Sequence, residues 1–270
     1  MRNTLLWIFT VIFTLSIAIY QRMTGPTYPV RGEVEIEEAT VSYRLIRSHT
    51  TGQNAPVIIE APEHILGVMH FRRFRSHDDW TTIPLIRNSG QLTGEIPTQP
   101  SAGKVQYNVL LGVTPDNLQP LTVEPVVIRF KGAVPSLVLI PHILLMFLAM
   151  LYSSRAGLEA AFNGPKTLSI VQFTAVFLFI GGIILGPIVQ KYAFGAFWTG
   201  WPWGHDLTDN KTLVAMIMWG IAWWRIRRNP AARGWAIAAA IVLLAVYLVP
   251  HSVLGSELDY TQMEAGIPGE

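Results

Sequence analysis

The segment FGAFWTGWPWGHDLTDNKT, residues 194–212, separates two apolar runs of the chain. It combines a cluster of indole side chains with adjacent polar groups: Trp198, Trp201, Trp203, His205, Asp206 and Asp209. Indole rings anchor helix ends at the membrane interface, which accounts for one or two of these tryptophans. Three tryptophans within six residues indicate in addition an apolar platform for a flat ligand, with a polar rim, held at a membrane surface.

The composition of the chain is that of a membrane protein. Of the 270 residues, 50% are hydrophobic and only 14% are charged, with several long uncharged runs. The formal net charge of +2 is too small to indicate binding of nucleic acid, and the basic residues lie mostly beside apolar runs. The chain has no cysteine, which excludes disulfides, thiolate metal sites and covalent attachment of haem through its own thiols.

The N-terminal apolar run, Leu5 to Tyr20, has about the minimum length that spans a bilayer and is flanked by Arg2 and Arg22. We interpret residues 1–23 as a retained signal-anchor span. A cleaved signal peptide is the alternative, but no small-x-small cleavage pattern follows the run.

Residues 24–132 differ in character, because short segments of alternating polarity are divided by Gly, Pro and Asn. This pattern predicts about seven antiparallel strands and a domain that resembles an immunoglobulin or fibronectin type III sandwich. Four histidines fall here: His49, His64, His70 and His77. They suggest a metal or anion site, but strand alternation favours a solvated face for them.

Four further apolar runs follow, at about Pro135–Tyr152, Leu168–Val189, Leu213–Trp224 and Trp235–Val249. The predicted fold is therefore a multi-pass α-helical membrane protein of about five spans with an inserted extracytoplasmic all-β sandwich. Residues 133–260 form the predicted four-helix membrane domain, and residues 261–270 form a tail.

The basic residues predict the orientation of the spans. Arg225, Arg227, Arg228 and Arg233 lie between the fourth and fifth runs, and Arg155 and Lys166 lie between the second and third. The positive-inside rule makes both loops cytoplasmic. The β domain, the tryptophan-rich loop and the acidic tail are then outside, which predicts a protein of the inner (cytoplasmic) membrane.

This topology brings His142, His205 and His251 to one side of the membrane. A histidine inside an apolar span requires a partner or a function, and a hydrogen bond to a neighbouring helix is the simpler explanation for a single one. Two histidines at outer helix ends, on either side of a tryptophan-rich loop, favour a pair of axial ligands for haem iron. His205, which has Gly and Asp neighbours, is the rival ligand or a group that supports a haem propionate.

Three segments resemble parts of the CcsA-type cytochrome c-assembly proteins. The first histidine span of that family is similar to IPHILLMFLAMLYSSRAGLEAA, and its "WWD" loop with the preceding approach is similar to ILGPIVQKYAFGAFWTGWPWGHDLTDNKT. The second histidine segment is similar to VPHSVLGSELDY. The resemblance covers residues 135–260, about half of the chain. It implies haem handling, with a b-type haem on His142 and His251 against the tryptophan platform, and with Asp206 at its rim. The loop departs from the family pattern, reading WPWGHDLTDNK in place of WSWDPKE.

Three functions remain open at this point. The first is haem handling in cytochrome c assembly or in a membrane redox complex, with a cytochrome or another complex subunit as partner. The second is a membrane-anchored scaffold whose sandwich recruits an extracytoplasmic partner without bound haem. The third is a small transporter, for which Gln172 and Glu159 are the candidate intramembrane polar groups. No catalytic constellation is evident, which favours a function other than that of an enzyme.

Overall fold

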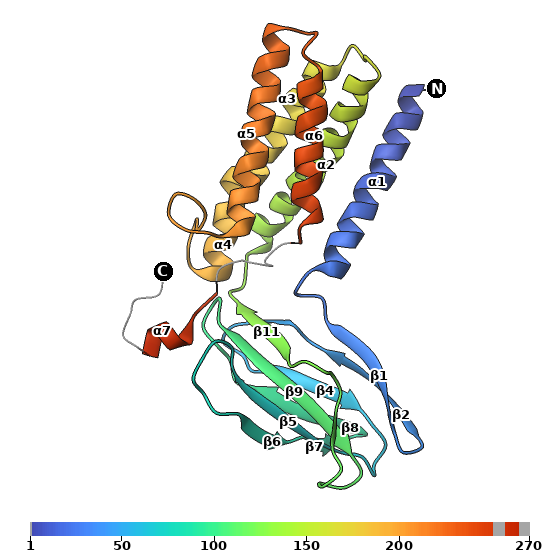
Figure 1. Cartoon of the computed structure of the whole chain (residues 1–270), viewed down its shortest axis with the longest axis vertical. Coiled ribbons are helices and arrows are strands. Elements are labelled where there is room, and N and C mark those ends of the chain that lie inside the picture. The colour runs from blue at the N-terminus through green and yellow to red at the C-terminus, as the bar shows by residue number, and fades with distance from the viewer. Residues whose placement is uncertain (1, 251–256, 265–270) are drawn as a thin grey trace. The chain divides into compact units, whose positions relative to one another are not determined.

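The structure, a computed structural model, describes residues 2–250 and 257–264. These residues form two compact units (Figure 1). The helical unit comprises the described residues of Met1–Pro26 and Val134–Ser256, and the β unit comprises Thr27–Ala133 together with the described residues from Glu257 onward. The sequence pattern had assigned residues up to 260 to the membrane domain, whereas residues 257–260 group with the strands.

The helical unit follows the predicted apolar runs closely. Its helices are α1 (Arg2–Thr24), α2 (Ser136–Ala161), α3 (Thr167–Leu178), the π-helix η1 (Phe179–Leu185), α4 (Gly186–Phe194), α5 (Leu207–Arg228) and α6 (Gly234–Leu248). The segments α3, η1 and α4 follow one another without a break. The rod that they form ends at Gly195, whose φ of 89° lies in the left-handed region that glycine adopts without strain.

Three helical segments of the described chain are long and apolar enough to cross a membrane: Arg2–Thr24, Ser136–Ala161 and Thr167–Phe194. Helix α6 is apolar but shorter, at 15 residues. Helix α5 begins with Asp209 and Lys211 in its first turns and ends with three arginines, so its apolar part is confined to the middle. The structure thus contains membrane-span-like helices, in agreement with the composition.

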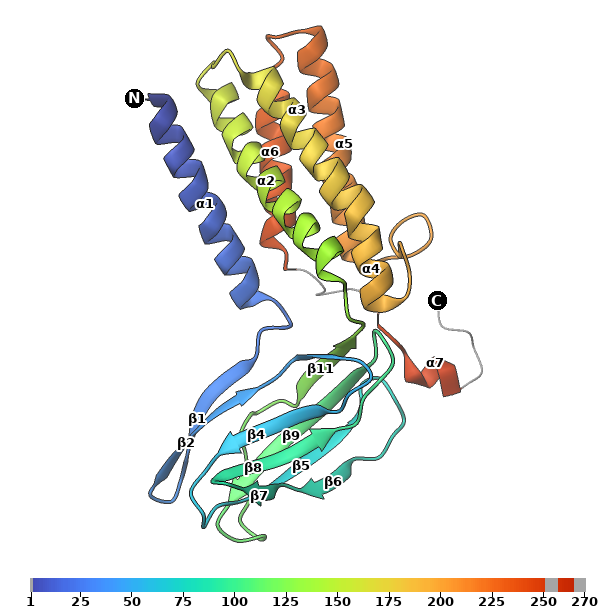
Figure 2. The ribbon, with the colours of Figure 1, turned by 180° about the vertical axis from the view of Figure 1, so that it is seen from behind.

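Small side chains allow the helices to pack closely in this unit. Figures 1 and 2 show α2, α3, α5 and α6 side by side. Their shared core is rich in alanine around the buried ring of Trp219: Ala149, Ala156, Ala160, Ala215, Ala222, Ala236 and Ala239. In lipid, such small residues stabilise helix pairs because they let the backbones approach closely.

The β unit contains eleven strands within the described residues, arranged in three sheets. The sheets have the orders β1–β2, β3–β11–β9–β5–β6 with β10 also paired to β9, and β4–β8–β7. The strands are β1 (Val30–Ile36), β2 (Ala39–Leu45), β3 (Ser48–Thr50), β4 (Ala55–Glu60), β5 (Leu66–Arg73), β6 (Thr81–Pro84), β7 (Ile86–Asn88), β8 (Gln91–Ile96), β9 (Lys104–Gly112), β10 (Gln119–Pro120) and β11 (Val126–Lys131). All strand pairs are antiparallel except the pair of β3 and β11.

Period-2 alternation in the sequence places one face of each long strand in a common core. In β4, Ala55, Val57 and Ile59 are buried while the residues between them are exposed. Strand β9 alternates in the same way, and Tyr107 in its middle is fully buried. The hydroxyl of Tyr107 donates a hydrogen bond to the carbonyl of Ile46 at 2.8 Å, and burial raises the pKa of this phenol. One hydrophobic cluster therefore joins strands of all three sheets.

The strand-rich region agrees with the sequence pattern, but the segments divide more finely than expected. The run EVEIEEATVSYRLI contributes to a hairpin, β1 and β2, whose turn contains Glu37 with a φ of 53°. The run HFRRFRS lies in β5 and the turn after it, and KVQYNVLL lies in β9. Very short strands such as β3 and β10 carry too few residues for alternation to reveal them.

The β unit is expected to fold without the membrane helices. Its hydrophobic cluster draws only on residues between Ile36 and Phe130, with partners between Val30 and Val113. A fragment of residues 24–132 should therefore be soluble and give a β-type circular dichroism spectrum. A matched variant with Ile128→Asp, which places a carboxylate in the fully buried core, should be unfolded. A disordered spectrum of the unmodified fragment would show that the strands need other parts of the chain.

Candidate functional site

A cavity in the helical unit gathers several of the residues singled out by the sequence. Its volume is about 200 Å³. Its walls come from α2, η1, α4, the tryptophan-rich loop and the start of α5: His142, Met146, Gly182, Gly186, Val189, Gln190, Phe194, Trp198, Asp206, Thr208, Asp209 and Thr212. Three residues that the sequence singled out, His142, Trp198 and Asp206, thus line a common space.

His142 is oriented by a backbone carbonyl of a neighbouring helical segment, which is the simpler of the two explanations that its place in an apolar span offered. Its Nδ1 lies 2.9 Å from the carbonyl oxygen of Gly181. Since a carbonyl only accepts hydrogen bonds, Nδ1 carries a proton, and in the neutral form of the ring the lone pair is then on Nε2. A histidine that ligates a metal is typically held in this way, with the other ring nitrogen donating to a carbonyl or carboxylate.

The π-helix η1 provides this carbonyl and comes close to two neighbouring helices. A side chain on Gly181 would place its Cβ 2.9 Å from Cβ of Leu145, and one on Gly182 would lie 2.9 Å from Cγ2 of Thr212. Both distances are shorter than real Cβ atoms allow, so only glycine permits this packing. Single π-helical turns inside longer helices occur frequently at functional sites.

Asp209 holds the tryptophan-rich loop in place. This carboxylate is only 7% exposed. Its Oδ2 accepts hydrogen bonds from the backbone N–H of Thr199 at 2.7 Å and from Nε2 of Gln190 at 3.1 Å. Next to it, Oδ1 of Asn210 accepts from the backbone N–H of Trp201 at 2.6 Å. The first turns of α5 thus fix the backbone of the loop directly.

Asp206 begins α5 as its N-cap. Its Oδ1 accepts a hydrogen bond from the N–H of Thr208 at 2.7 Å. Its own N–H donates to the carbonyl of Thr199 at 3.0 Å, which closes the loop. A Cβ on Gly200 would lie 2.6 Å from Cβ of Asp209, so the tight course of the loop depends on glycine there.

The three tryptophans have different environments. Trp198 lines the cavity, and its Nε1 donates to the carbonyl of Trp201 at 3.1 Å. Trp201 and Trp203 are 69% and 81% exposed and do not line this cavity. His205 is also exposed. The expected second ligand, His251, lies outside the described residues.

The sequence pattern named Asp209 only as a polar neighbour of the tryptophans, and it did not point to Gln190 and Met146 as parts of the site. The signal for Asp209 was its place three residues after an N-cap aspartate, at the start of a helix. Gln190 stands out as an amide near the end of an apolar run. Met146 carried no signal, because a methionine one turn after His142 is ordinary in an apolar helix.

The residues of the cavity fit one axial contact to haem iron and part of an apolar wall. The imidazole of His142 has an available ring nitrogen, and Trp198 and Phe194 are aromatic neighbours on the wall. The volume of about 200 Å³ lies below the roughly 300–1,000 Å³ typical of ligand sites. The cavity is therefore too small for an entire macrocycle.

The β unit shows no comparable site for a metal. Within residues 2–250 and 257–264, no group of three or more His, Asp or Glu side chains could hold a metal ion. The four histidines that raised this possibility, His49, His64, His70 and His77, do not form such a group among the described residues.

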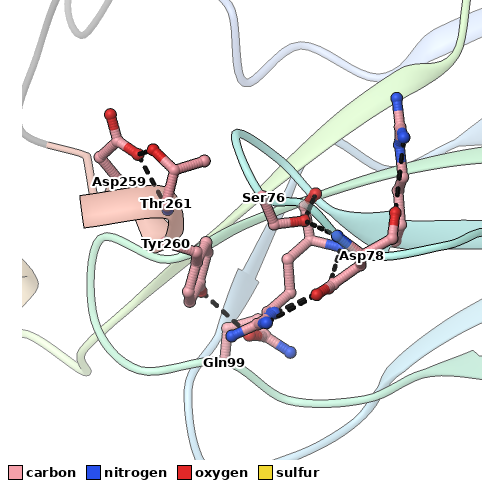
Figure 3. Close-up of polar contacts among 8 residues, drawn as sticks. Ser76, Asp78, Gln99, Asp259, Tyr260 and Thr261 are labelled. Carbon is pink, nitrogen blue, oxygen red and sulfur yellow. Dashed lines mark hydrogen bonds and ion pairs between the residues drawn. The ribbon is translucent and has the colours of Figure 1, made fainter. Parts of the chain in front are cut away.

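A second polar cluster, in the β unit, binds the chain's own C-terminal segment (Figure 3). The carboxylate of Glu257 forms ion pairs with Lys104 and Arg75. The hydroxyl of Tyr260, at the start of α7 (Tyr260–Glu264), donates to Oε1 of Gln99 at 2.9 Å. Burial raises the pKa of Tyr260 and lowers that of Lys104.

The same cluster includes an ion pair beneath the tyrosine ring. Nη2 of Arg73 lies 2.6 Å from Oδ1 of Asp78, and the Arg73 guanidinium carbon lies 4.7 Å from the ring centroid of Tyr260. The hydrogen bonds from Arg73 hold the pKa of Asp78 below its usual value. These contacts attach residues 257–264 to the strands and offer no catalytic arrangement.

Comparison of the chain with models of protein families, with curated proteins and with solved structures finds no match.

Proposed function

We propose that the helical unit binds haem at the outer end of the bundle, with His142 as one axial ligand, and that the protein handles haem in cytochrome assembly or in a membrane redox complex. The observation that carries the proposal is the hydrogen bond between Nδ1 of His142 and the carbonyl of Gly181. It orients the ring and leaves Nε2 available to iron. The aromatic wall beside this histidine supports the same function.

The expected second ligand follows the last described residues of α6 closely. Nζ of Lys211 donates to the carbonyl of Val249 at 2.6 Å, which attaches the chain after α6 to the first turns of α5. Asp209 and Thr212, in those same turns, line the cavity. His251 is two residues beyond Val249, a reach of about 7 Å in an extended chain, which supports its assignment as the partner of His142.

Bound haem would supply one-electron chemistry or be passed to a partner apoprotein. The roles of this chain would be to bind and to orient. His142 and His251 would hold the iron, Trp198 would contact the ring, and Asp209 would keep the loop in place. Because the cavity is small, most of the macrocycle would lie outside it, where the exposed Trp201 and Trp203 provide apolar surface.

An absorption spectrum tests this function directly. The full chain, expressed with ample haem and purified in detergent, should show a sharp α-band after reduction with dithionite, as expected for iron with two strong-field axial ligands. A colourless protein would exclude resident haem and favour a membrane-anchored scaffold function without haem.

The proposed membrane arrangement has five spans, with the β unit as an immunoglobulin-like or fibronectin type III-like sandwich outside the inner membrane. Helix α5 contains 22 residues and is thus about 33 Å long, enough to cross the hydrocarbon core. Arg225, Arg227 and Arg228 at its C-terminal end support a cytoplasmic position for that end.

Cysteine labelling tests this topology, because the parent chain has no cysteine. Thr199→Cys and Asn229→Cys probe the two ends of α5. In intact cells an impermeant maleimide should label the first variant, and it should reach the second only after the membrane is permeabilised. Labelling of both variants in intact cells would contradict the five-span arrangement.

A scaffold function without haem is the second candidate, and the exposed face of the three-stranded sheet favours it. Ile58 and Ile86 both pair with Thr93 in the sheet β4–β8–β7, so they lie in one row across three strands. Their side chains are 47% and 70% exposed. An exposed apolar row on a sheet is a feature of protein-binding surfaces.

Replacing this row tests the scaffold function. The double variant Ile58→Ser, Ile86→Ser should lose cross-linking to the extracytoplasmic partner while the folded β unit keeps its thermal stability. The matched control, Val123→Ser, alters another exposed apolar residue and should keep the cross-link. If the double variant cross-links as the parent does, this face is not the recruiting surface.

A further inference from the structure

A buried ion pair lies at the opposite end of the helical unit from the tryptophan-rich loop, where α1 begins and α2 ends (Figure 1). Nη2 of Arg155 is 2.7 Å from Oε2 of Glu159, and the two side chains are only 2% and 8% exposed. The same Nη2 donates to Oδ1 of Asn3 at 2.7 Å. One nitrogen of the guanidinium thus makes both of these contacts.

The rest of this guanidinium is buried without hydrogen bonds. Neither Nε nor Nη1 of Arg155 has a hydrogen-bond partner in the part of the chain that the structure describes. The face of the Trp7 ring lies 5.4 Å from the guanidinium carbon. A ring face does not replace the hydrogen-bond acceptors that the three N–H groups on Nε and Nη1 require. A buried charged donor without an acceptor is costly, so this side chain indicates a missing anionic group.

A cavity of about 180 Å³ adjoins this ion pair. Three cationic residues line it, Arg155, Arg2 and Lys166, against a single acidic residue, Glu159. The carboxylate of Glu159 is already bound by Arg155 and by the backbone N–H of Lys166 at 3.1 Å. The electrostatic field in the cavity therefore favours an anion.

The turn between α2 and α3 adds to this preference. Gly164 and Pro165 line the cavity immediately before α3, a helix of 12 residues whose N-cap, Lys166, provides no side-chain cap. The N-terminus of a helix carries a partial positive charge and is a frequent binding place for phosphate.

We propose that this cavity binds a phosphate group, contacted by Arg155, Lys166 and Arg2. Phosphate offers several strong acceptors to a guanidinium fork, which matches the unsatisfied nitrogens of Arg155. The group comes either from the headgroup of an anionic phospholipid or from free inorganic phosphate. On the topology proposed above, this end of the bundle faces the cytoplasmic leaflet, where basic residues attract anionic lipids.

Native mass spectrometry of the full chain in detergent tests the lipid source. The probes are short-chain phosphatidylglycerol and, as the zwitterionic comparison, short-chain phosphatidylcholine. Lys166→Gln and Arg2→Gln should each weaken retention of phosphatidylglycerol about fivefold, which corresponds to about 1 kcal/mol for one cation near a lipid phosphate. The control, Arg227→Gln, removes an exposed cation from the last turn of α5 and should change retention less than twofold.

Thermal unfolding with inorganic phosphate tests the other source. Two results together would assign the site to free phosphate. Phosphate should stabilise the parent chain but not Lys166→Gln or Arg2→Gln, and all variants should retain lipid equally. The conservative variant Arg155→Lys should bind more weakly than the parent even if it folds normally, because lysine lacks the fork. If Lys166→Gln, Arg2→Gln and the parent respond alike to both probes, the proposal is wrong.

Discussion

His142→Ala should abolish the sharp reduced α-band of the purified protein or convert it to a high-spin spectrum. The substitution removes the imidazole whose Nδ1 is held by the carbonyl of Gly181, so the iron loses a strong-field ligand. It also enlarges an existing cavity rather than opening a new one in a dense core. The loss of the band should therefore exceed any loss of folded protein, which the elution profile in detergent measures separately.

Two variants define the specificity of this result. His205→Ala alters an exposed histidine of the tryptophan-rich loop and should leave the α-band nearly intact. His251→Ala should have the same effect as His142→Ala, because a single remaining imidazole cannot maintain a low-spin centre. If only His205→Ala loses the band, the assignment of His142 is wrong and the loop histidine is the ligand.

The helices of this protein were predictable because their signal is strong and local. Long apolar runs predicted the positions of α1, α2 and the rod from α3 to α4, but α2 extends to Ala161 and the rod to Phe194, beyond the expected ends at Tyr152 and Val189. The π-helix was not predictable from the apolar pattern, and its Gly181 and Gly182 pack against residues distant in sequence, Leu145 and Thr212. His142 contacts the carbonyl of Gly181, 39 residues away in the sequence, so the sequence pattern singled out the histidine but not its partner.

The candidate site was predictable in its residue types and less so in its geometry. The tryptophan cluster marked the loop that contributes Trp198 to the cavity wall, but composition alone does not distinguish Trp198 from the exposed Trp201 and Trp203. Composition also does not reveal the hydrogen bonds from the start of α5 that hold the loop backbone. The attachment of Glu257 and Tyr260 to the β unit is equally non-local, since an acidic tail after an apolar run gives no indication of where it binds.

Asp209→Ala should destabilise the tryptophan-rich loop by about 3 kcal/mol. The donors to this buried carboxylate include the N–H of Thr199 and Nε2 of Gln190, and hydrogen bonds to charged groups contribute roughly 1.5–3 kcal/mol each. The alanine would leave both donors without this acceptor. Limited proteolysis in detergent should then cut between Gly195 and Asp206 in the variant, under conditions in which the parent stays intact.

The matched control is Asp206→Ala, which removes the N-cap of the same helix. A lost cap costs about 1 kcal/mol, so this loop should be cut more slowly than that of Asp209→Ala. Asp209→Asn keeps an acceptor oxygen of similar position, and its rate of cleavage should fall between those of the alanine variant and the parent.

Because Trp198 depends on this loop for its place in the cavity wall, Asp209→Ala should also broaden the α-band even though it leaves both proposed ligands unchanged. An uncut loop and an unaltered band in Asp209→Ala would mean that the tryptophans hold the loop without the carboxylate.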